Sequence, residues 1–514
     1  MATSQPHKRY RHLKLILFGF FIISTSPVFP VGNTDSLTIS RNLLQQGKFH
    51  GAYKIIKSYS KDHPDDFNST WLYAYTSYFV RHFHKSDQLY QKAMKADPDN
   101  YYLKLDYARM LVNVGSYNKA RPILQSYLSY DSLDGVALVT RARLNYDEAD
   151  YKNALIDLNK IPSKSNEFQY VGLVKQEINI ARAPWILTRV GYSTDDQPLQ
   201  GFYPEIRAGW SLHPLATMDL SLQVPVFLWD SSSSTGFWGQ AGNTMFFAKP
   251  RIVFSVHLGI LKFPKEKFIT WTGDFALQKS FLRNIEMAFK AERSPYFSTI
   301  SSIDSCVIEN HFSFTLGLTD INSWHGKMNV EIRNYPIDQN NIFSLNGWVL
   351  APPVKFSVIE LRFGLGYNYS TSQKNNFVAK KGLPEILSDY NPATQIEGIY
   401  NPYFTPNDQS VGSFIAAFAI HLTKNINFDV NMNLGIISFA MIPYLYLDRN
   451  SSGDLYIARD FVGENYFPAE MTASLGFKLT PTIRLQADYN FSNTYYFIRH
   501  NIGLGLKLNL TNGN

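Results

Sequence analysis

The chain contains very little cysteine and little charge. Of its 514 residues only Cys306 is a cysteine, and 18% are charged. A single cysteine excludes an internal disulfide framework and a cysteine-ligated metal site. The 12 histidines, among them the close pair His82 and His84, show no spacing typical of metal ligands. We therefore expect neither a metal nor a cofactor.

Basic runs typical of nucleic-acid binding are absent as well. The formal net charge is +7, but residues 184–514 contain 25 Lys and Arg against 26 Asp and Glu. The positive excess therefore lies in the N-terminal part of the chain. The sequence predicts no nucleic-acid partner.

The N-terminal residues lack an apolar run that is long enough for a transmembrane helix. Cationic residues from His7 to Lys14 precede the apolar segment Leu15–Ile23, and the small residues Ser24–Ser26 follow it. This order is typical of a secretory signal, and the apolar segment is too short to span a bilayer. We predict a signal peptide over residues 1–32, and a retained short anchor is the alternative.

Residues 33–183 repeat with a spacing of 34 residues. Three columns of the repeat read Gly47, Arg81, Gly115 and Ala149, then Phe49, Phe83, Tyr117 and Tyr151, then Ala52, Ser86, Ala120 and Ala154. Small residues allow two antiparallel helices to approach closely, and the aromatic residue locks the hairpin. Pro64 and Pro98 stop the second helix of the first two blocks.

These columns resemble the tetratricopeptide repeat, in about four blocks over roughly 130 residues. The resemblance implies an α-helical solenoid whose groove binds a protein or peptide. Arg81 and Ser132 depart from the repeat pattern. Glu167–Ala181 predicts a capping helix that covers the last apolar face of the solenoid.

After Ala183 the apolar residues recur with a period of two. In Asn425–Ile436 they alternate with Asn, Asp and Gly throughout. Such runs are about ten residues long, as a tilted strand needs to be to cross a bilayer. A soluble sandwich or propeller is the alternative, but its strands are usually shorter and no blade motif recurs. Residues 184–514 are predicted to form a transmembrane antiparallel β-barrel, which makes the fold class α + β multidomain.

Short turns alternate with longer polar connections along the barrel segment, which predicts about 16 strands. An even number of strands returns the C-terminus to the periplasm. The barrel is therefore expected in the outer membrane, in contact with lipid, with the N-terminal domain in the periplasm. An additional hairpin in Phe439–Phe461 would raise the count to about 18 strands. The last strand is predicted at Ile502–Leu510.

Charged residues of both signs fall on the faces predicted to point inward. They are Glu205, Arg207, Asp219, Asp274, Glu286, Lys290, Glu331, Arg333, Glu360, Arg362, Asp429, Arg484 and Asp488. A mixed lining suits a neutral or zwitterionic polymer better than a simple ion, because neither sign dominates. The alternative is that these side chains merely line water.

The longest external connection, Thr371–Ser410, is rich in aromatic residues. Tyr390, Tyr400, Tyr403 and Phe404 occur there beside Asn and Asp residues. Rings and amides together provide the stacking and hydrogen bonding that a sugar requires. We expect these four residues to contact sugar or to gate the lumen, with a passive surface loop as the alternative.

The order of signal peptide, tetratricopeptide repeats and barrel is similar to that of the exopolysaccharide export porins, which are the poly-N-acetylglucosamine porin and the cellulose-export subunit. This resemblance implies that the repeats recruit periplasmic partners and that the barrel passes a polysaccharide outward. The alternative is a non-transporting anchor, assembly or adhesion protein whose repeats bind a protein.

A remote alternative is an outer-membrane lipid hydrolase. His311 and Ser313 share one strand face, Asn322 falls in the following turn, and Asn329 lies on the next strand. This arrangement resembles the His-x-Ser and Asn set of outer-membrane phospholipases, in which an imidazole activates the serine. Alternation by itself places polar residues two apart, so we expect no enzyme.

Overall fold

The computed structural model describes residues 35–196, 199–229, 232–247, 251–265, 269–281, 284–321, 323–388 and 395–511. The predicted signal peptide, Asn322 and Tyr390 lie outside these residues. The chain divides into two compact units after Ile178. Among the described residues, no helix combines the length and the apolar character that crossing a membrane requires.

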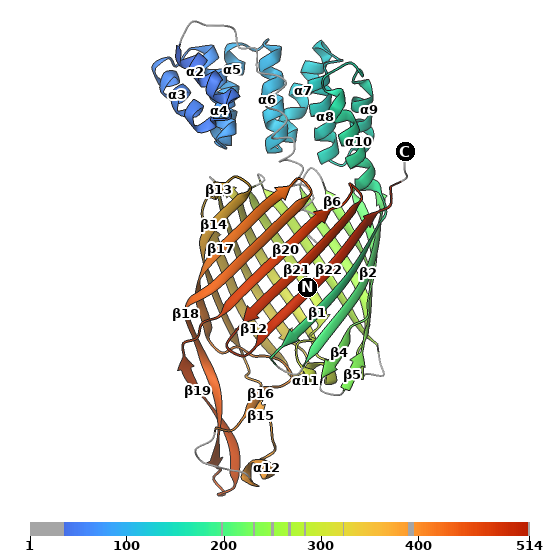
Figure 1. Cartoon of the computed structure of the whole chain (residues 1–514), viewed down its shortest axis with the longest axis vertical. Coiled ribbons are helices and arrows are strands. Elements are labelled where there is room, and N and C mark those ends of the chain that lie inside the picture. Colours follow the sequence, from blue (N-terminus) through green and yellow to red (C-terminus); the bar gives the residue numbers. More distant parts are fainter. Residues whose placement is uncertain are drawn as a thin grey trace. The chain divides into compact units, whose positions relative to one another are not determined.

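The first unit consists of helices packed as successive antiparallel pairs (Figure 1). They are α2 (Asp35–Gln45), α3 (Phe49–Asp62), α4 (Phe67–Phe79), α5 (Phe83–Ala96), α6 (Tyr101–Val114), α7 (Tyr117–Tyr130), α8 (Gly135–Asp147), α9 (Tyr151–Lys160) and α10 (Phe168–Arg182). The helical repeat predicted from the sequence is confirmed, and α10 occupies the position of the predicted capping helix. Asp66, Asn100 and Asp134, which are 34 residues apart, cap the N-termini of α4, α6 and α8 by accepting backbone N–H bonds.

The column that begins with Gly47 has a different physical role from the predicted one. Gly47, Arg81, Gly115 and Ala149 all have positive φ, between 60° and 73°, at the turn after the first helix of each pair. A Cβ added to Gly47 would meet no atom within 4 Å. The column is therefore selected by the left-handed backbone at the end of the helix, and not by close helix approach.

Close helix approach occurs at the alanine column instead. Ala52, Ala120 and Ala154 are fully buried in the helical core. The aromatic column closes each pair: Phe49 stacks on Phe79 with ring centroids 4.6 Å apart. The other aromatic residues of the column also make contacts within the unit: Phe83 lies 6.0 Å from Tyr78, Tyr151 lies 5.7 Å from Tyr146, and the Tyr117 hydroxyl donates to Asp147 at 2.6 Å.

The second unit is a closed antiparallel barrel (Figure 1). Among the described residues its wall has sixteen strands: β1 (Trp185–Asp195), β2 (Gln200–His213), β3 (Ala216–Gln223), β6 (Phe237–Phe247), β7 (Ile252–Lys262), β8 (Thr270–Phe281), β9 (Ile285–Pro295), β10 (Ile308–Ile321), β11 (Trp324–Tyr335), β12 (Asn340–Leu350), β14 (Ile359–Ser372), β17 (Gln409–Thr423), β18 (Ile426–Arg449), β20 (Ala469–Lys478), β21 (Ile483–Asn493) and β22 (Ile498–Asn509). The register from Trp185 opposite Asn509 to Asp195 opposite Arg499 joins β1 to β22 and closes the barrel. Short strands extend the wall: β4 (Val226–Trp229) and β5 (Ser232–Thr235) form a hairpin, and β13 (Val354–Phe356) pairs with β14.

The outward face of the wall is apolar and exposed. Large exposed side chains from successive strands include Ile206, Leu220, Leu258, Phe289, Phe314, Ile332, Phe363, Leu365, Leu434 and Leu504. So much apolar surface is stable only against lipid. A closed sixteen-stranded barrel with this exterior is an outer-membrane barrel, as the alternation predicted.

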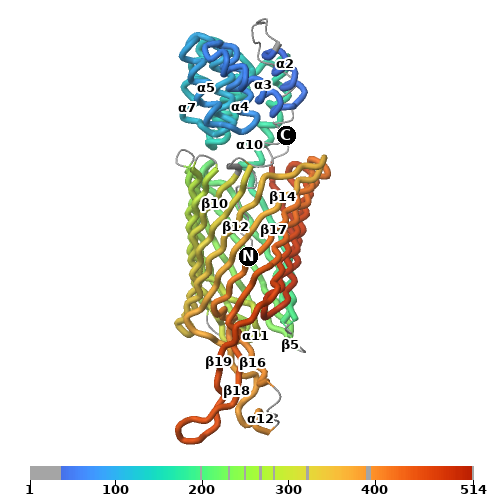
Figure 2. Tube along the Cα trace, turned by 90° about the vertical axis from the view of Figure 1, so that its left-hand side faces the viewer, coloured from blue at the N-terminus to red at the C-terminus, as the bar shows by residue number. Residues whose placement is uncertain are grey.

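The additional hairpin considered at Phe439–Phe461 exists, but it does not enter the barrel wall. The second half of β18, Ala440–Arg449, pairs with β19 (Leu455–Glu464), and β19 pairs with no other strand among the described residues. Figure 2 shows this hairpin beyond the end of the wall, together with α12 (Leu383–Ser388). A second small hairpin of β15 (Phe377–Ala379) and β16 (Gly398–Tyr400) lies beside it. The wall count is therefore sixteen and not eighteen.

Candidate functional site

The thirteen charged residues predicted to line a lumen all lie on the inner face of the wall. The strand registers place them on the face opposite to the exposed apolar side chains. Glu331, for example, lies opposite Ser313 and Ser344, while the next residue, Ile332, is exposed on the outside. Alternation fixes this placement, because successive side chains of a strand point to opposite faces. Whether they contact a transported molecule stays a prediction.

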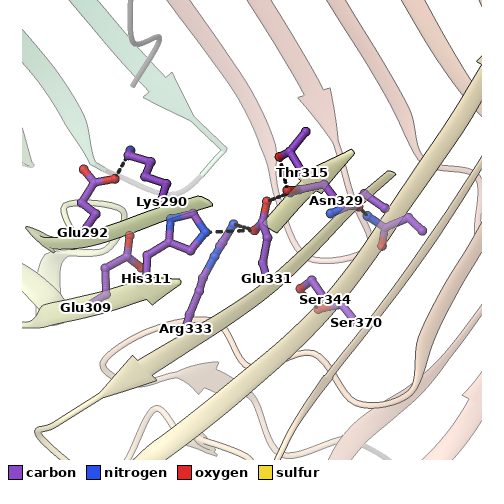
Figure 3. Close-up of polar contacts among 12 residues, drawn as sticks. Lys290, Glu292, Glu309, His311, Thr315, Asn329, Glu331, Arg333, Ser344 and Ser370 are labelled. Atoms are coloured by element: carbon purple, nitrogen blue, oxygen red, sulfur yellow. Dashed lines mark hydrogen bonds and ion pairs between the residues drawn. The ribbon is translucent and has the colours of Figure 1, made fainter. Parts of the chain in front are cut away.

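One sector of the inner wall is formed by β9, β10, β11, β12 and β14 (Figure 3). Glu331 is its centre: Arg333 Nη2 donates to Glu331 Oε2 at 3.0 Å, and His311 Nε2 lies 3.4 Å from the same oxygen. Asn329 donates to the other carboxylate oxygen. The carboxylate is thus compensated by a guanidinium, an imidazole and an amide.

Other groups of this sector are paired in the same way. Lys290 forms an ion pair with Glu292, and the Tyr335 hydroxyl donates to Glu309 at 3.0 Å. Hydrogen-bonded pairs of uncharged side chains lie beside these ion pairs on the inner wall. Thr315 Oγ1 donates to Asn329 at 2.7 Å, and the hydroxyls of Ser344 and Ser370 are 2.9 Å apart. The sector therefore presents alternating donors and acceptors rather than a field of one sign.

A second charged cluster lies on β2, β3, β7 and β8. Arg207 Nη2 lies 2.7 Å from Asp219 Oδ1, and His257 Nδ1 lies 3.0 Å from Asp274 Oδ2. His257 Nε2 is 3.3 Å from Asp219, so the imidazole bridges the two carboxylates. The sequence indicated both carboxylates and the arginine, but not the histidine that joins them.

The remaining predicted lumen residues divide into paired and separate ones. Arg362 pairs with Glu360 at 2.9 Å, and Asp488 pairs at 3.6 Å with Arg189, a residue that the sequence did not single out. Asn427 donates to Asp429 at 3.3 Å, and Arg484 also has an interaction partner.

Glu205 and Glu286 have no ion-pair partner among the described residues. Most of the lumen charge is thus compensated locally, within and between strands.

The residues of the hydrolase alternative do not meet as a nucleophile and its base. His311 lies against Glu331, and Asn329 is bonded to Thr315 and Glu331. Among the described residues, no hydrogen bond joins His311 to Ser313. Asn322 lies outside the described part of the chain. The geometry therefore shows imidazole–carboxylate pairing where an activated serine requires an imidazole–hydroxyl bond.

At the end of the barrel with the long connections, the segment Tyr296–Val307 folds into the mouth, and we name it the mouth plug. It contains the short helix α11 (Ile300–Asp304), which Figures 1 and 2 both show at this end of the wall. Phe297 packs against Phe227 and Phe263, with ring centroids 4.9 and 5.7 Å apart, and Ile303 is fully buried. Apolar burial fixes the plug inside the mouth.

Tyr403, which lies in the long Thr371–Ser410 connection, holds the plug in place. Its ring stacks on Tyr335 at 3.6 Å and lies 6.1 Å from Tyr296, the first residue of the plug. The Tyr403 hydroxyl donates to Asp338 at 2.7 Å. Burial, followed by this bond to Asp338, raises the pKa of Tyr403, so the phenol stays protonated and keeps donating.

Two more contacts hold the plug in place. Thr299 Oγ1 donates to the Pro402 carbonyl at 2.5 Å, and Arg499 Nη2 donates to the Ser298 carbonyl at 3.1 Å. Arg499 is itself fixed by Asp195 at 3.0 Å. The plug is therefore tied both to the long connection and to the strand pair that closes the barrel.

The four predicted sugar-contact residues have different positions. Tyr403 is 0% exposed, so a sugar would reach its ring only after this segment moves, and whether Tyr403 contacts sugar or gates the lumen stays a prediction. Phe404 stacks on Tyr496 at 5.7 Å, and Tyr400 packs edge-on against the same ring at 4.6 Å. Tyr390 lies outside the described residues.

Sequence reasoning missed the mouth plug. The connection from Ser294 to Ser305 looks like an ordinary polar loop, since serines and threonine dominate it. The signal that could have revealed it is a set of three large apolar residues, Phe297, Ile300 and Ile303. Such residues are usually buried, so they predict that this segment packs against the barrel.

Comparisons with known proteins give structural likenesses only. No protein-family model and no curated protein matches the sequence. Similar solved structures include a bacterial polysaccharide outer membrane secretin, with TM-score 0.45, 8% identity, and coverage of 64% of this chain and 99% of that one. OpdK from Pseudomonas aeruginosa has TM-score 0.32 and 8% identity, covering 64% and 98%. MamA from Desulfovibrio magneticus RS-1 has TM-score 0.25 and 14% identity, covering 29% and 89%.

The resemblance to these structures is a distant structural likeness, and each TM-score is below 0.5. At such TM-scores and identities it carries no statement about what the chain transports or binds.

Proposed function

We propose that the barrel passes a polysaccharide or a similar hydrophilic polymer outward across the outer membrane, while the repeat domain recruits a periplasmic protein. The observation that carries this proposal is the inner wall. Its charges are compensated beside one another, as in Arg333–Glu331 and Arg207–Asp219, and hydroxyl and amide pairs fill the spaces between them.

Such a wall suits a chain rich in hydroxyl groups. A sugar residue both donates and accepts hydrogen bonds, so it can exchange partners along alternating donors and acceptors. A simple ion would instead favour a lining dominated by one sign of charge. Because most carboxylates and guanidiniums of the wall already have partners, few positions offer an unpaired charge that would hold a passing chain.

The mouth plug is the element that has to move in this function. It fills part of the mouth with apolar side chains, and contacts with Tyr403, Pro402 and Arg499 hold it. It is attached at both ends to neighbouring wall strands, β9 and β10, so it can swing out without unfolding the barrel. We propose that export requires this displacement.

The connections favour one orientation. β1 begins, and β22 ends, at the end of the barrel that carries the short turns, and α10 ends at Arg182, just before β1. In outer-membrane barrels the short turns face the periplasm. We therefore propose that the repeat domain lies in the periplasm, as the sequence predicted.

A partner of the repeat domain would find exposed apolar side chains there. Tyr102 and Tyr130 are 67% and 65% exposed on neighbouring helices, and Leu133 follows close by. Exposed side chains of this size favour contact with another protein. We propose that this partner is a periplasmic protein.

Replacement of Phe297–Cys306 by a short Gly-Ser linker tests the export function. In planar bilayers we expect the altered barrel to conduct ions, and linear neutral polysaccharide to block the current transiently. The same linker in place of Asn450–Gly453, at the tip of the β18–β19 hairpin, is the matched control and should leave the barrel closed. A folded barrel without the plug that carries no current would contradict export and support the anchor or adhesion alternative.

We propose no catalytic role for His311 and Ser313. Support comes from the pairing of His311 with Glu331. Phospholipase activity that disappears in Ser313→Ala would contradict this.

A further inference from the structure

The two hairpins beyond the barrel wall enclose a groove of about 470 Å³. We name it the outer groove. Its lining comes from the β15–β16 hairpin, from both strands of the β18–β19 hairpin and from the turn between β21 and β22. Three segments that are distant in sequence thus build one concave surface, and Figures 1 and 2 both show the two hairpins together outside the barrel.

Five aromatic residues line this groove: Phe377, Tyr400, Tyr444, Tyr495 and Tyr496. Tyr400 is almost fully buried and meets Phe377 and Tyr496 edge-on, with ring centroids 5.1 and 4.6 Å apart. Phe377 and Tyr444 are only partly buried and Tyr495 is exposed, so these three rings offer surface to a ligand. Tyr400 forms the floor of the groove between them.

The charged part of the lining is acidic. Glu397 and Glu464 contribute carboxylates, and the described residues that line the groove include no Lys or Arg. Glu397 forms an exposed ion pair with Lys380 at 3.3 Å, outside the lining, whereas no ion pair involves Glu464 among the described residues. The two carboxylates disfavour a phosphate-bearing or uronic chain, although Arg459 donates to the Phe377 carbonyl close by. Hydroxyl groups and amino groups are the donors that these carboxylates accept.

We infer that the outer groove is a binding site for a neutral or amino-bearing polysaccharide, an inference that rests on the proposed export function for its biological meaning. Sugar rings present C–H faces that pack on aromatic side chains, while their equatorial hydroxyls reach carboxylates. A volume of about 470 Å³ falls among pockets that enclose small ligands, so it holds a short stretch of chain rather than a folded protein.

The groove is connected to the mouth plug by a very short segment. Tyr400 lies on the floor of the groove, and Tyr403, three residues later, stacks on Tyr335 inside the mouth. The Tyr496 hydroxyl accepts the backbone N–H of Tyr400 at 3.2 Å, which ties this segment to the β21–β22 turn. The groove and the contact that holds the plug therefore share one short segment of the chain, Tyr400–Tyr403.

Binding of cellotetraose and of a chitosan tetramer to the detergent-purified full chain, measured by calorimetry, tests the site. Tyr444→Ala and Tyr495→Ala should each weaken both ligands by about tenfold, which corresponds to the loss of one ring contact. Glu464→Gln should weaken the chitosan tetramer more than cellotetraose, because only the former carries ammonium groups. Tyr456→Ala, on the same hairpin but outside the groove lining, is the matched control and should bind like the wild type.

Folding of each variant is checked by heat-modifiable migration of the barrel. Affinities that are unchanged in the folded Tyr444→Ala and Tyr495→Ala variants, or no binding of either tetramer by the wild type, would overturn the site. The proposed export function is tested separately. A plug-free barrel that carries no current refutes export, even if the tetramers still bind. A plug-free barrel that conducts but binds neither tetramer refutes only the binding site in the outer groove.

Discussion

Removal of the Tyr403 side chain should open the mouth of the barrel. Tyr403 is fully buried, its ring stacks on Tyr335 at 3.6 Å, and its hydroxyl donates to Asp338. Truncation of a large buried ring costs about 3 kcal/mol or more. If that contact exists only while the plug is seated, Tyr403→Ala shifts the balance between closed and open barrels roughly 100-fold toward open.

Single-channel recording in planar bilayers measures this shift as the open probability. Tyr403→Phe keeps the stacked ring and loses only the hydrogen bond, so it should raise the open population by about fivefold, at roughly 1 kcal/mol. Tyr456→Ala is the control, because its hydroxyl also donates to an aspartate, Asp448, but on the exposed hairpin. An open probability of Tyr403→Ala equal to that of the control would refute the reasoning that the Tyr403–Tyr335 contact closes the mouth.

Three further predictions concern the repeat domain and the wall. Arg81→Gly should raise the free energy of unfolding by up to about 1 kcal/mol, and Gly47→Ala should lower it by a similar amount. The reason is that both positions have positive φ, which favours glycine. Changes of the opposite sign in a denaturant titration would contradict this prediction. Burial raises the pKa of Asp106, so this carboxyl costs stability as the pH rises from its ordinary value of 3.8 through the raised one. Asp106→Asn should flatten that part of the pH profile of stability. Asp106→Leu should lower the free energy of unfolding by about 2–4 kcal/mol, since two buried donors lose their acceptor. Equal stability of the two variants would contradict this prediction. In the plug-free barrel, Arg333→Gln should shift the reversal potential toward cation selectivity, because Glu331 loses its guanidinium partner; an unchanged potential would place this wall outside the conducting path.

The two architectures were predictable because each has a strict period. A spacing of 34 residues requires identical packing in each helical pair, and the fully buried Ala52, Ala120 and Ala154 occupy one column for that reason. A period of two between lipid and water fixes which side of a strand each residue takes, and the inward positions follow from it. The reason for the Gly47 column was less accessible, since a small residue suits a close contact and a positive φ equally well.

The residue types could not distinguish a strand in the wall from a strand that projects beyond it. The first half of β18 alternates between apolar and polar residues, and the second half, Ala440–Arg449, is largely apolar, yet either could form a wall strand. Only the first half pairs with β17 and β20. The second half pairs with β19 and leaves the barrel. Pairing between neighbours, rather than the character of a strand, decided the count.

The sequence by itself determined which residues face lipid, which face the lumen and where the helices end, because these depend on neighbours within a few positions. Only the tertiary structure decided which charges compensate one another, as His257 does for Asp219 and Asp274, since the partners lie on strands that are 17 to 38 residues apart. It also decided that the segment Tyr296–Val307 enters the mouth and that Tyr403 packs beside it. Loop residues carry no period, and their burial depends on contacts that arise only when the barrel closes.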